Sequence, residues 1–185
     1  MKTFFSADIH LGHANVIRFC NRPYQSEDEM NKGLIHNWNQ RVKPGDVVYH
    51  VGDFCFRGGW QAGKTKAQFW ESQLNGKIIH IQGNHDINNG TKALITHAIM
   101  QFGGHEVFVT HRPPTMKAEV PDFCDFVICG HIHEKWKHLY DPEGDINVPI
   151  INVGVDVWNY TPVSMSETLV YYDHIIKYNK INKVQ

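Results

Sequence analysis

Short runs of apolar residues, each about the length of one β-strand, alternate with polar segments along most of the chain. These runs lie at residues 1–6, 47–53, 77–86, 105–111, 125–133, 135–140, 149–155 and 167–173. Apolar runs of four to eight residues that end at glycine or acidic residues are typical of buried strands. We therefore expect strands at these places.

The spacing of apolar residues predicts helices between the early runs. Ser26 and Glu29 form the N-terminal signature of a capping box, in which a serine is followed three residues later by a glutamate. The helix that they start carries one apolar stripe, made of Met30, Leu34, Ile35, Trp38 and Val42. We expect two further helices, at Lys64–Leu74 and at Thr91–Phe102.

Helices thus interleave with strands in the first half of the chain, and strands predominate in the second. This order favours an α/β or α+β fold, with sheet packed on sheet inside and helices outside. The chain has 185 residues, of which 42% are hydrophobic and 20% charged, so we expect one domain over residues 1–185. The end of the chain, from about Ile175, reads as a loosely attached tail.

The charge balance and the polar pattern exclude several classes of protein. Lys and Arg number 18 and Asp and Glu 19, and the resulting net charge of -1 gives no basic field for a nucleic-acid backbone. The N-terminus turns polar after five residues, and no apolar run could span a bilayer, so we expect a cytoplasmic protein without membrane contact. The four cysteines contain no CxxC pair and are expected to be reduced and buried.

Side chains of the types that bind metal ions in proteins follow five of the expected strands. They are Asp8 and His10, Asp53, Asn84 with His85 and Asp86, His111, and His131 with His133. Carboxylate, amide and imidazole donors without thiolates suit Mn²⁺, Fe, Zn²⁺ or Ni²⁺ better than Ca²⁺, which prefers oxygen ligands alone. Even without His85 and Asp86, the other seven side chains are more donors than one ion needs.

The spacing within the motifs supports a shared cavity. In D-x-H and H-x-H the two side chains are two residues apart, so an extended backbone would point both to one face. Asp53 is a carboxylate that two ions could share. Two ions about 3.5 to 4 Å apart would lower the pKa of a bridging water. They would also hold the attacking and the leaving oxygen of an in-line displacement. With two carboxylates and one hydroxide such a cluster keeps a positive charge, which attracts phosphate.

The motifs D-x-H, GD, GNHD, a lone histidine after a strand, and GHxH occur here in that order. This series resembles the calcineurin-like metallophosphoesterase superfamily, over Asp8 to about Asp156. The stretches DIHLGHANVIRFCNRPY and INVGVDVW look like its small, cap-less bacterial and phage members. The resemblance implies a β-sandwich of two sheets flanked by helices, with metal ions at the carboxyl ends of strands. It also implies a phosphohydrolase that uses a metal-bridging hydroxide as nucleophile.

The resemblance assigns roles to individual residues. One divalent ion, most readily Mn²⁺, would be held by Asp8, His10 and His133, and a second by Asn84, His111 and His131. Asp53 would bridge the two ions. His85 would protonate the leaving oxygen or stabilise the charge of the transition state, and Asp86 would orient the His85 ring. Three residues near these loops are candidate substrate contacts: His13, Arg57 and Arg112.

Two other functions fit parts of the sequence. GGWQAGKT at Gly58–Thr65 matches the P-loop pattern for nucleotide phosphates, but residues 54–57 separate it from the strand that it should leave directly. A non-catalytic metal-binding scaffold would typically lack His85 or Asp53, and both are present. The substrate stays open between phosphomonoester and phosphodiester, with a nucleotide or oligonucleotide as one option, and no stable protein partner is expected.

Overall fold

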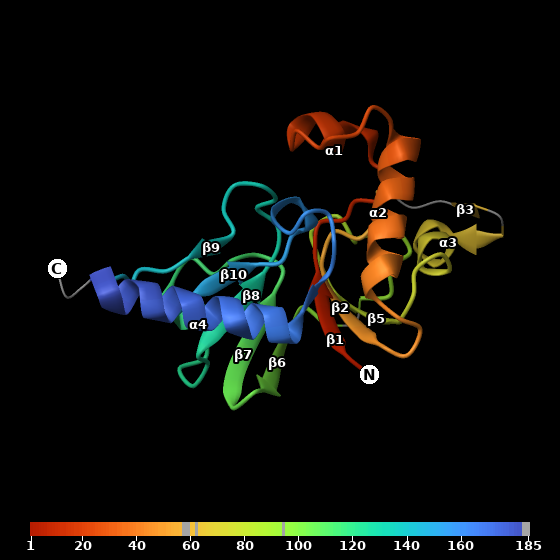
Figure 1. Cartoon of the computed structure of the whole chain (residues 1–185). Coiled ribbons are helices and arrows are strands. Elements are labelled where there is room, and N and C mark those ends of the chain that lie inside the picture. Colours follow the sequence, from red (N-terminus) through yellow and green to blue (C-terminus); the bar gives the residue numbers. More distant parts are fainter. Residues whose placement is uncertain (57–59, 62, 94, 183–185) are drawn as a thin grey trace.

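Two β-sheets form the centre of the molecule (Figure 1). The computed structural model describes residues 1–56, 60–61, 63–93 and 95–182. The first sheet has the strand order β11 (Val163–Ser164), β1 (Thr3–Ser6), β2 (Val47–Val51) and β5 (Lys77–Ile81). Strands β1, β2 and β5 are parallel, and β11 is antiparallel to β1.

The second sheet has five strands and is also mixed. Its order is β6 (His97–Phe102), β7 (His105–Thr110), β8 (Phe126–Cys129), β10 (Ile150–Asn152) and β9 (His138–Leu139). Strands β7, β8 and β10 are parallel, and the edge strands β6 and β9 run antiparallel to their neighbours. The predicted architecture of two sheets flanked by helices is confirmed.

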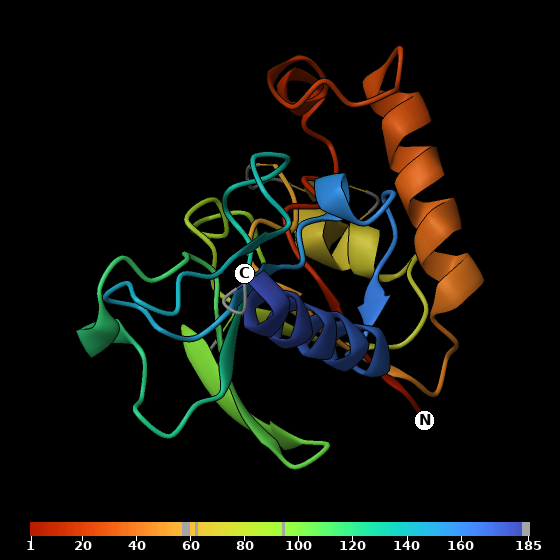
Figure 2. The same cartoon turned by 60° about the vertical axis from the view of Figure 1, so that its left-hand side comes forward.

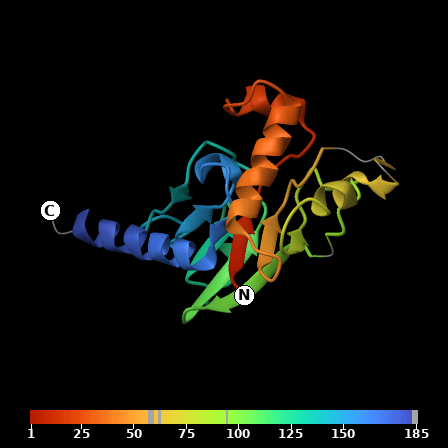
Figure 3. The same cartoon turned by 45° about the vertical axis from the view of Figure 1, so that its right-hand side comes forward.

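The helices lie outside the sheets, as Figures 2 and 3 show from two further sides. They are α1 (Ala14–Phe19), α2 (Glu27–Arg41), α3 (Lys66–Glu71), α4 (Met165–Asn182) and the 3₁₀ turns η1 (Lys117–Glu119) and η2 (Val155–Val157). Helix α2 begins as predicted, because Ser26 Oγ accepts a hydrogen bond from the Glu29 N–H (3.2 Å). Within the described residues, no helix is long and apolar enough to cross a membrane.

Two large apolar cores hold these layers together. The first lies between the outer face of the first sheet and helices α1 to α3, and it includes Phe4, Val48, Leu34 and Trp38. The second lies between the two sheets and continues to α4; its buried members include Phe5, Val51, Val109, Ile128, Ile151 and Ile175. Phe4 and Phe5, which are neighbours on β1, therefore lie in different cores, because successive side chains of a strand point to opposite faces of the sheet.

The segment Thr91–Phe102, expected to be helical, contains no helix in its described part. Its second half is β6, which pairs with β7 along its whole length, from His97 opposite Thr110 to Phe102 opposite His105. Gly103 and Gly104 connect the two strands with φ angles of 60° and 84°. Two consecutive left-handed residues make the tight turn that hairpins prefer, so the glycine pair overrides the helical pattern.

The segment at residues 167–173, expected to be a strand, belongs to helix α4. Ser164 and Glu167 form the reciprocal hydrogen bonds of a capping box at its start, Ser164 N–H to Glu167 Oε2 (2.8 Å) and Glu167 N–H to Ser164 Oγ (3.3 Å). The expected tail from Ile175 differs as well, because α4 continues to Asn182 and Ile175 is buried in the second core.

The P-loop-like segment Gly58–Thr65 is described only in part, since residues 58, 59 and 62 lie outside the described residues. Its strands β3 (Trp60–Gln61) and β4 (Lys64–Thr65) form an antiparallel hairpin. Thr65 then caps α3, which is shorter than predicted, by accepting the Gln68 N–H at its hydroxyl (3.3 Å). This differs from a P-loop, in which the lysine and threonine lie on a loop that opens directly into a helix.

The two sheets meet at the carboxyl ends of their parallel strands. Ala7, just after β1, donates its N–H to Val153 O, and it accepts the N–H of Val155 at its own carbonyl, both at 3.1 Å. This parallel bridge between Ala7 and Gly154 brings the loops of both sheets to one edge of the molecule.

Candidate metal centre

The loops at this edge carry all seven predicted metal ligands. Asp8 and His10 follow β1, Asp53 follows β2, Asn84 follows β5, His111 follows β7, and His131 and His133 follow β8. All six strands that are parallel within the two sheets end here. The carboxyl ends of parallel strands are where open α/β sheets place their binding sites.

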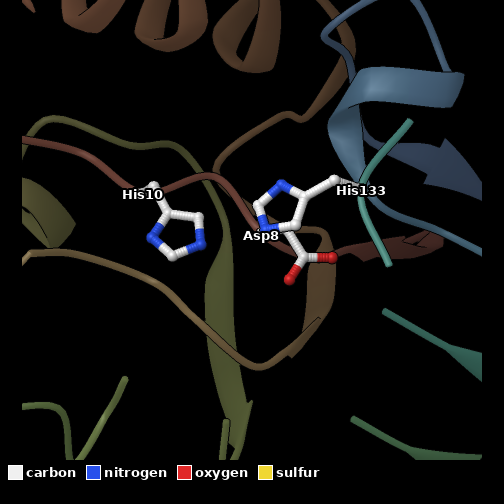
Figure 4. A group of neighbouring side chains, drawn as sticks. All are labelled: Asp8, His10 and His133. Carbon is white, nitrogen blue, oxygen red and sulfur yellow. The ribbon is translucent and has the colours of Figure 1, made fainter. Parts of the chain in front are cut away.

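Asp8, His10 and His133 form what we term the first group. One potential ligand atom of each lies within 4.8 Å of the others, and Figure 4 shows the three side chains next to one another. The rings of His10 and His133 are stacked, with centroids 5.1 Å apart. Asp8 Oδ1 and His10 Nε2 are buried without a hydrogen-bond partner. Because unpartnered buried polar atoms are costly, these two atoms fit a site for a cation.

Asp53 lies between the first group and the remaining ligands. Its Oδ2 is 3.6 Å from His10 Nε2 and 3.5 Å from His111 Nε2. Its Oδ1 accepts the backbone N–H of His85 (2.8 Å), so the second oxygen is the one that faces both histidines. This is the position that a carboxylate shared by two ions would need.

Asn84, His111 and His131 form the second group. His111 Nδ1 lies 2.8 Å from the carbonyl oxygen of Val51, which can only accept, so this nitrogen carries a proton. His111 Nε2 then faces Asp53 Oδ2 and, at 3.0 Å, Asn84 Oδ1. A ring nitrogen between two oxygens needs a proton or a cation. Asp53, His111 and His131 also place ligand atoms within 4.8 Å of one another.

The backbone of these loops is strained. Five of the seven candidate ligands have positive φ angles between 50° and 75°: Asp8, His10, Asp53, His131 and His133. Residues other than glycine rarely adopt this left-handed conformation, and where they do, they cluster at functional sites. The paired side chains of D-x-H and H-x-H therefore converge through tight turns and not through the extended backbone that the spacing suggested.

The electrostatics of the site follow from burial and from close charge pairs. Burial raises the pKa of Asp8 to about 6. Burial also acts to raise the pKa of Asp53, but the hydrogen bond and charge of His111 outweigh it and lower that pKa. The pKa of His111 is raised, since Asp53 and Asp8 outweigh the effect of burial. Burial lowers the pKa of His10, which favours the neutral ring that binds a metal ion.

The role of Asp86 differs from the one expected, which was to orient the His85 ring. Its Oδ2 accepts the backbone N–H groups of Asp53 (2.9 Å) and Gly83 (2.8 Å). Its Oδ1 accepts the N–H of Phe54 (2.9 Å) and the Asn89 amide (3.0 Å). Four hydrogen bonds occupy the acceptor capacity of a carboxylate, so Asp86 holds the Asp53 and Asn84 loops together.

His85 lies at the open side of the centre. Its side chain is 51% exposed, and its Nε2 is 4.0 Å from Asp53 Oδ2. A hollow of about 310 Å³ lies beside the second group, lined by Asn84, His111, Arg112, Gln82, Ile87 and Thr96, among others. The exposed Arg112 therefore lies within reach of this hollow.

The other two candidate substrate contacts have different positions. His13 stacks on Phe56, with ring centroids 4.1 Å apart, and its Nδ1 is 3.4 Å from that of His10. Arg57 lies outside the described residues. The four cysteines are free and buried, as predicted.

Three buried residues of the site were not predicted as functional. Asp156 Oδ2 is 3.2 Å from His133 Nδ1, and Asp156 forms an ion pair with Arg22. Asn152 donates to the carbonyl oxygen of His133 (2.8 Å). Arg22 and Asp156 lie within the stretches DIHLGHANVIRFCNRPY and INVGVDVW, and a polar residue that follows an apolar strand was the available signal for Asp156.

Comparisons with known proteins show the family of the chain. Residues 1–162 match the sequence model of the calcineurin-like phosphoesterase superfamily domain. The chain is 36% identical over 164 residues to the uncharacterized protein MJ1445 of Methanocaldococcus jannaschii, covering 89% of this chain and 87% of that protein. It is 25% identical over 203 residues to the gene 66 protein of Mycobacterium phage L5, covering 94% and 95% of the two chains.

A solved structure shares the fold. The protein AQ665 from Aquifex aeolicus, of unknown function, superimposes with a TM-score of 0.66 at 23% identity, covering 90% of this chain and 97% of that one. The family match covers the whole of both sheets except β11, together with every candidate ligand. The chain therefore belongs to the calcineurin-like phosphoesterase superfamily.

Proposed function

We propose that the protein is a phosphoesterase that hydrolyses a phosphomonoester or phosphodiester with two divalent transition-metal ions, most readily Mn²⁺. The observation that carries this proposal is the position of Asp53 Oδ2, 3.6 Å from a histidine of the first group and 3.5 Å from one of the second. The first group would hold one ion, the second group the other, and Asp53 both. When bound, the ions would activate water near neutral pH and offset the charge of the phosphoryl group.

His85 is the residue proposed to act on the leaving group. Its backbone N–H is fixed by Asp53 Oδ1, while its ring is half-exposed at the rim of the centre. A ring in that position can reach a substrate oxygen from the solvent side and donate a proton to it as the ester bond breaks. His13 lies beside His10 of the first group, Arg112 lies beside His111 of the second, and we propose that both contact the substrate.

The proposal is tested by loading the protein with Mn²⁺ and removing excess metal. Close to two ions per chain are expected, together with hydrolysis of at least one class among aryl phosphates, bis-aryl phosphates, cyclic nucleotides and single-stranded oligonucleotides. Asp53→Asn is the matched variant, because it keeps the size of the side chain and removes the shared charge. Metal content near zero in the parent protein would contradict the proposal.

The non-catalytic alternative differs in one measurable respect. A metal-binding scaffold would retain two ions and hydrolyse none of these substrates, and Asp53→Asn would change metal content alone. For nucleotide binding at Gly58–Thr65 the described residues offer no support, since Lys64 and Thr65 belong to a hairpin strand. We also propose a cytoplasmic location, because four free, buried thiols suit a reducing compartment.

A further inference from the structure

The Arg22 side chain is fully buried beneath the first group, and its guanidinium contacts acceptors on two sides. Its Nε and one terminal nitrogen donate to the two carboxylate oxygens of Asp156, at 2.8 and 3.0 Å. The same terminal nitrogen donates to the carbonyl oxygen of Asp8 (2.6 Å), and the other donates to that of Ile9 (3.0 Å). The side chains of Arg22 and Asp156 are 0% and 1% exposed.

The two carbonyl groups belong to the strained turn that presents Asp8 and His10. Both residues have left-handed backbones, with φ angles of 55° and 51°, and Ile9 lies between them. A left-handed turn of residues other than glycine persists only where its surroundings hold it. Arg22 supplies two hydrogen bonds to this turn from inside the protein, so it fixes the backbone that carries two of the three first-group ligands.

Asp156 connects Arg22 to the third ligand of the group. Its Oδ2 lies 3.2 Å from His133 Nδ1, and because a carboxylate accepts, Nδ1 carries the proton. His133 Nε2 is then the nitrogen whose lone pair can bind a metal ion. A carboxylate behind a ligating histidine commonly fixes the ring and its tautomer in metal sites. Among the described residues, the hydrogen bonds of Arg22 reach no member of the second group.

We propose that Arg22 and Asp156 act together as positioning residues for the first group and therefore set the affinity of one of the two ions. Arg22 holds the turn that presents Asp8 and His10 through the carbonyl groups of Asp8 and Ile9, and it contacts His133 through Asp156. This inference rests on the proposed function in one respect, which is that the first group binds a metal ion.

Two substitutions test the pair without removing its bulk. Arg22→Lys keeps the positive charge, but a single ammonium cannot reproduce the planar fork that contacts Asp156 and two carbonyl groups at once. Asp156→Asn keeps the shape, but it removes the negative charge and turns an NH₂ group toward a donor of Arg22 or His133, so at least one of the three hydrogen bonds is lost. Arg18→Lys is the matched control, because Arg18 is an exposed residue of α1.

The measurements are Mn²⁺ titration by calorimetry, electron paramagnetic resonance of the Mn²⁺-loaded protein, and circular dichroism for folding. Each variant is expected to bind one ion as the parent does and the other about 10- to 100-fold more weakly, the usual effect of losing such a supporting contact. The spin-coupled signal of an ion pair should give way to that of a single ion. Arg18→Lys should match the parent.

Double variants, in which Arg22→Lys is combined with the loss of a candidate ligand, identify which ion is affected. In a His10→Ala background, which already lacks the first-group ion, Arg22→Lys should change the metal content no further. In an Asn84→Ala background, which weakens binding of the second-group ion, Arg22→Lys should weaken binding of the first-group ion by about the same 10- to 100-fold. A merely structural role of Arg22 would lower metal content equally in both backgrounds.

The inference and the proposed function fail in different ways. If the parent itself binds fewer than two ions, the dinuclear function is wrong. If the parent binds two, and folded Arg22→Lys or Asp156→Asn binds both with the parent's affinities or loses both equally, the positioning role is wrong. Should Arg22→Lys not fold, Asp156→Asn decides by the same criteria.

Discussion

The two halves of the metal centre are held by buried charges of opposite sign. Beneath the first group lies the cation Arg22, which donates to the carbonyl groups of Asp8 and Ile9 and to Asp156. Beneath the loops that carry Asp53 and Asn84 lies the anion Asp86, which accepts three backbone N–H groups and the amide of Asn89.

The difference follows from the turns themselves. The turn after β1 directs carbonyl groups inward, and it needs a donor; the turns after β2 and β5 direct N–H groups inward, and they need an acceptor. An unpaired backbone group inside a protein costs free energy either way. Sharp turns of the main chain thus decide which charge is buried under each half, before any metal ion binds.

The largest expected effect is on kcat, and it comes from a residue proposed to act on the substrate and not to hold the ligand loops. His85 lies in the half that Asp86 holds, yet its ring is exposed and contacts no backbone group in the hydrogen bonds of the described residues. His85→Ala should lower kcat by about 10² to 10⁴, the range for loss of a general acid, with two ions still bound. Steady-state kinetics and metal analysis measure this, with His36→Ala on the exposed face of α2 as control.

Substrates sharpen the same test. The loss on His85→Ala should be smaller for nitrophenyl esters, whose leaving group needs little protonation, than for alkyl esters. An equal loss of metal in His85→Ala and Asp53→Asn would place His85 among the supporting residues instead.

Removal of the ions should show how much they contribute to the free energy of unfolding. An ion present at a hundred times its Kd adds about 2.7 kcal/mol to the free energy of unfolding. Urea denaturation of the Mn²⁺-loaded protein should therefore give a higher midpoint than denaturation with EDTA. Asp53→Asn should reduce that difference, and an unfolding free energy that is independent of EDTA would contradict a metal centre in the native state.

Asp86→Asn tests whether the comparison between the halves holds. The amide keeps one acceptor oxygen and turns an NH₂ group toward backbone donors, so two of four hydrogen bonds are lost. We expect a loss in metal affinity of about 10- to 100-fold that falls on the second ion and on the shared Asp53. Calorimetric titration beside Asp122→Asn, an exposed carboxylate, measures it. A loss confined to the first-group ion would break the comparison.

The smallest effect is expected for a substitution in the hairpin before α3. Lys64 is exposed on the hairpin strand β4, in the segment that matches the P-loop pattern. Lys64→Ala should leave metal-dependent hydrolysis within about threefold of the parent, since a tenfold change requires 1.36 kcal/mol. Loss of ATP binding that the parent retains with Mg²⁺ after removal of transition metals would contradict this.

The fold was predictable where local pattern and tertiary packing agree. The apolar runs at residues 47–53 and 77–86 contain the parallel strands β2 and β5, and Ser26 caps α2. The spacing of apolar residues gave a wrong prediction where a short turn or cap motif opposed it. The glycine pair at Gly103–Gly104 turns a segment with helical spacing into a hairpin. Ser164 and Glu167 started a helix in a segment rich in β-formers.

The candidate ligands could be recognised from sequence because each comes directly after an apolar run. Asp156 also follows an apolar run, but its pairing with Arg22, 134 residues away, could not be predicted from residue spacing. Asp86 was recognised, but its role was not, because four hydrogen bonds to the backbone of two loops leave no trace in residue spacing.

The bridge between Ala7 and Gly154 has a consequence for how the protein folds. It joins the first strand to the chain after β10, so the two sheets can close on each other only when most of the chain is available. Contacts between segments so distant in sequence slow folding, because the loop between them must close first. We expect a nascent chain that ends before Val153 to lack a closed interface between the sheets, so that assembly of the native fold is a late event in synthesis.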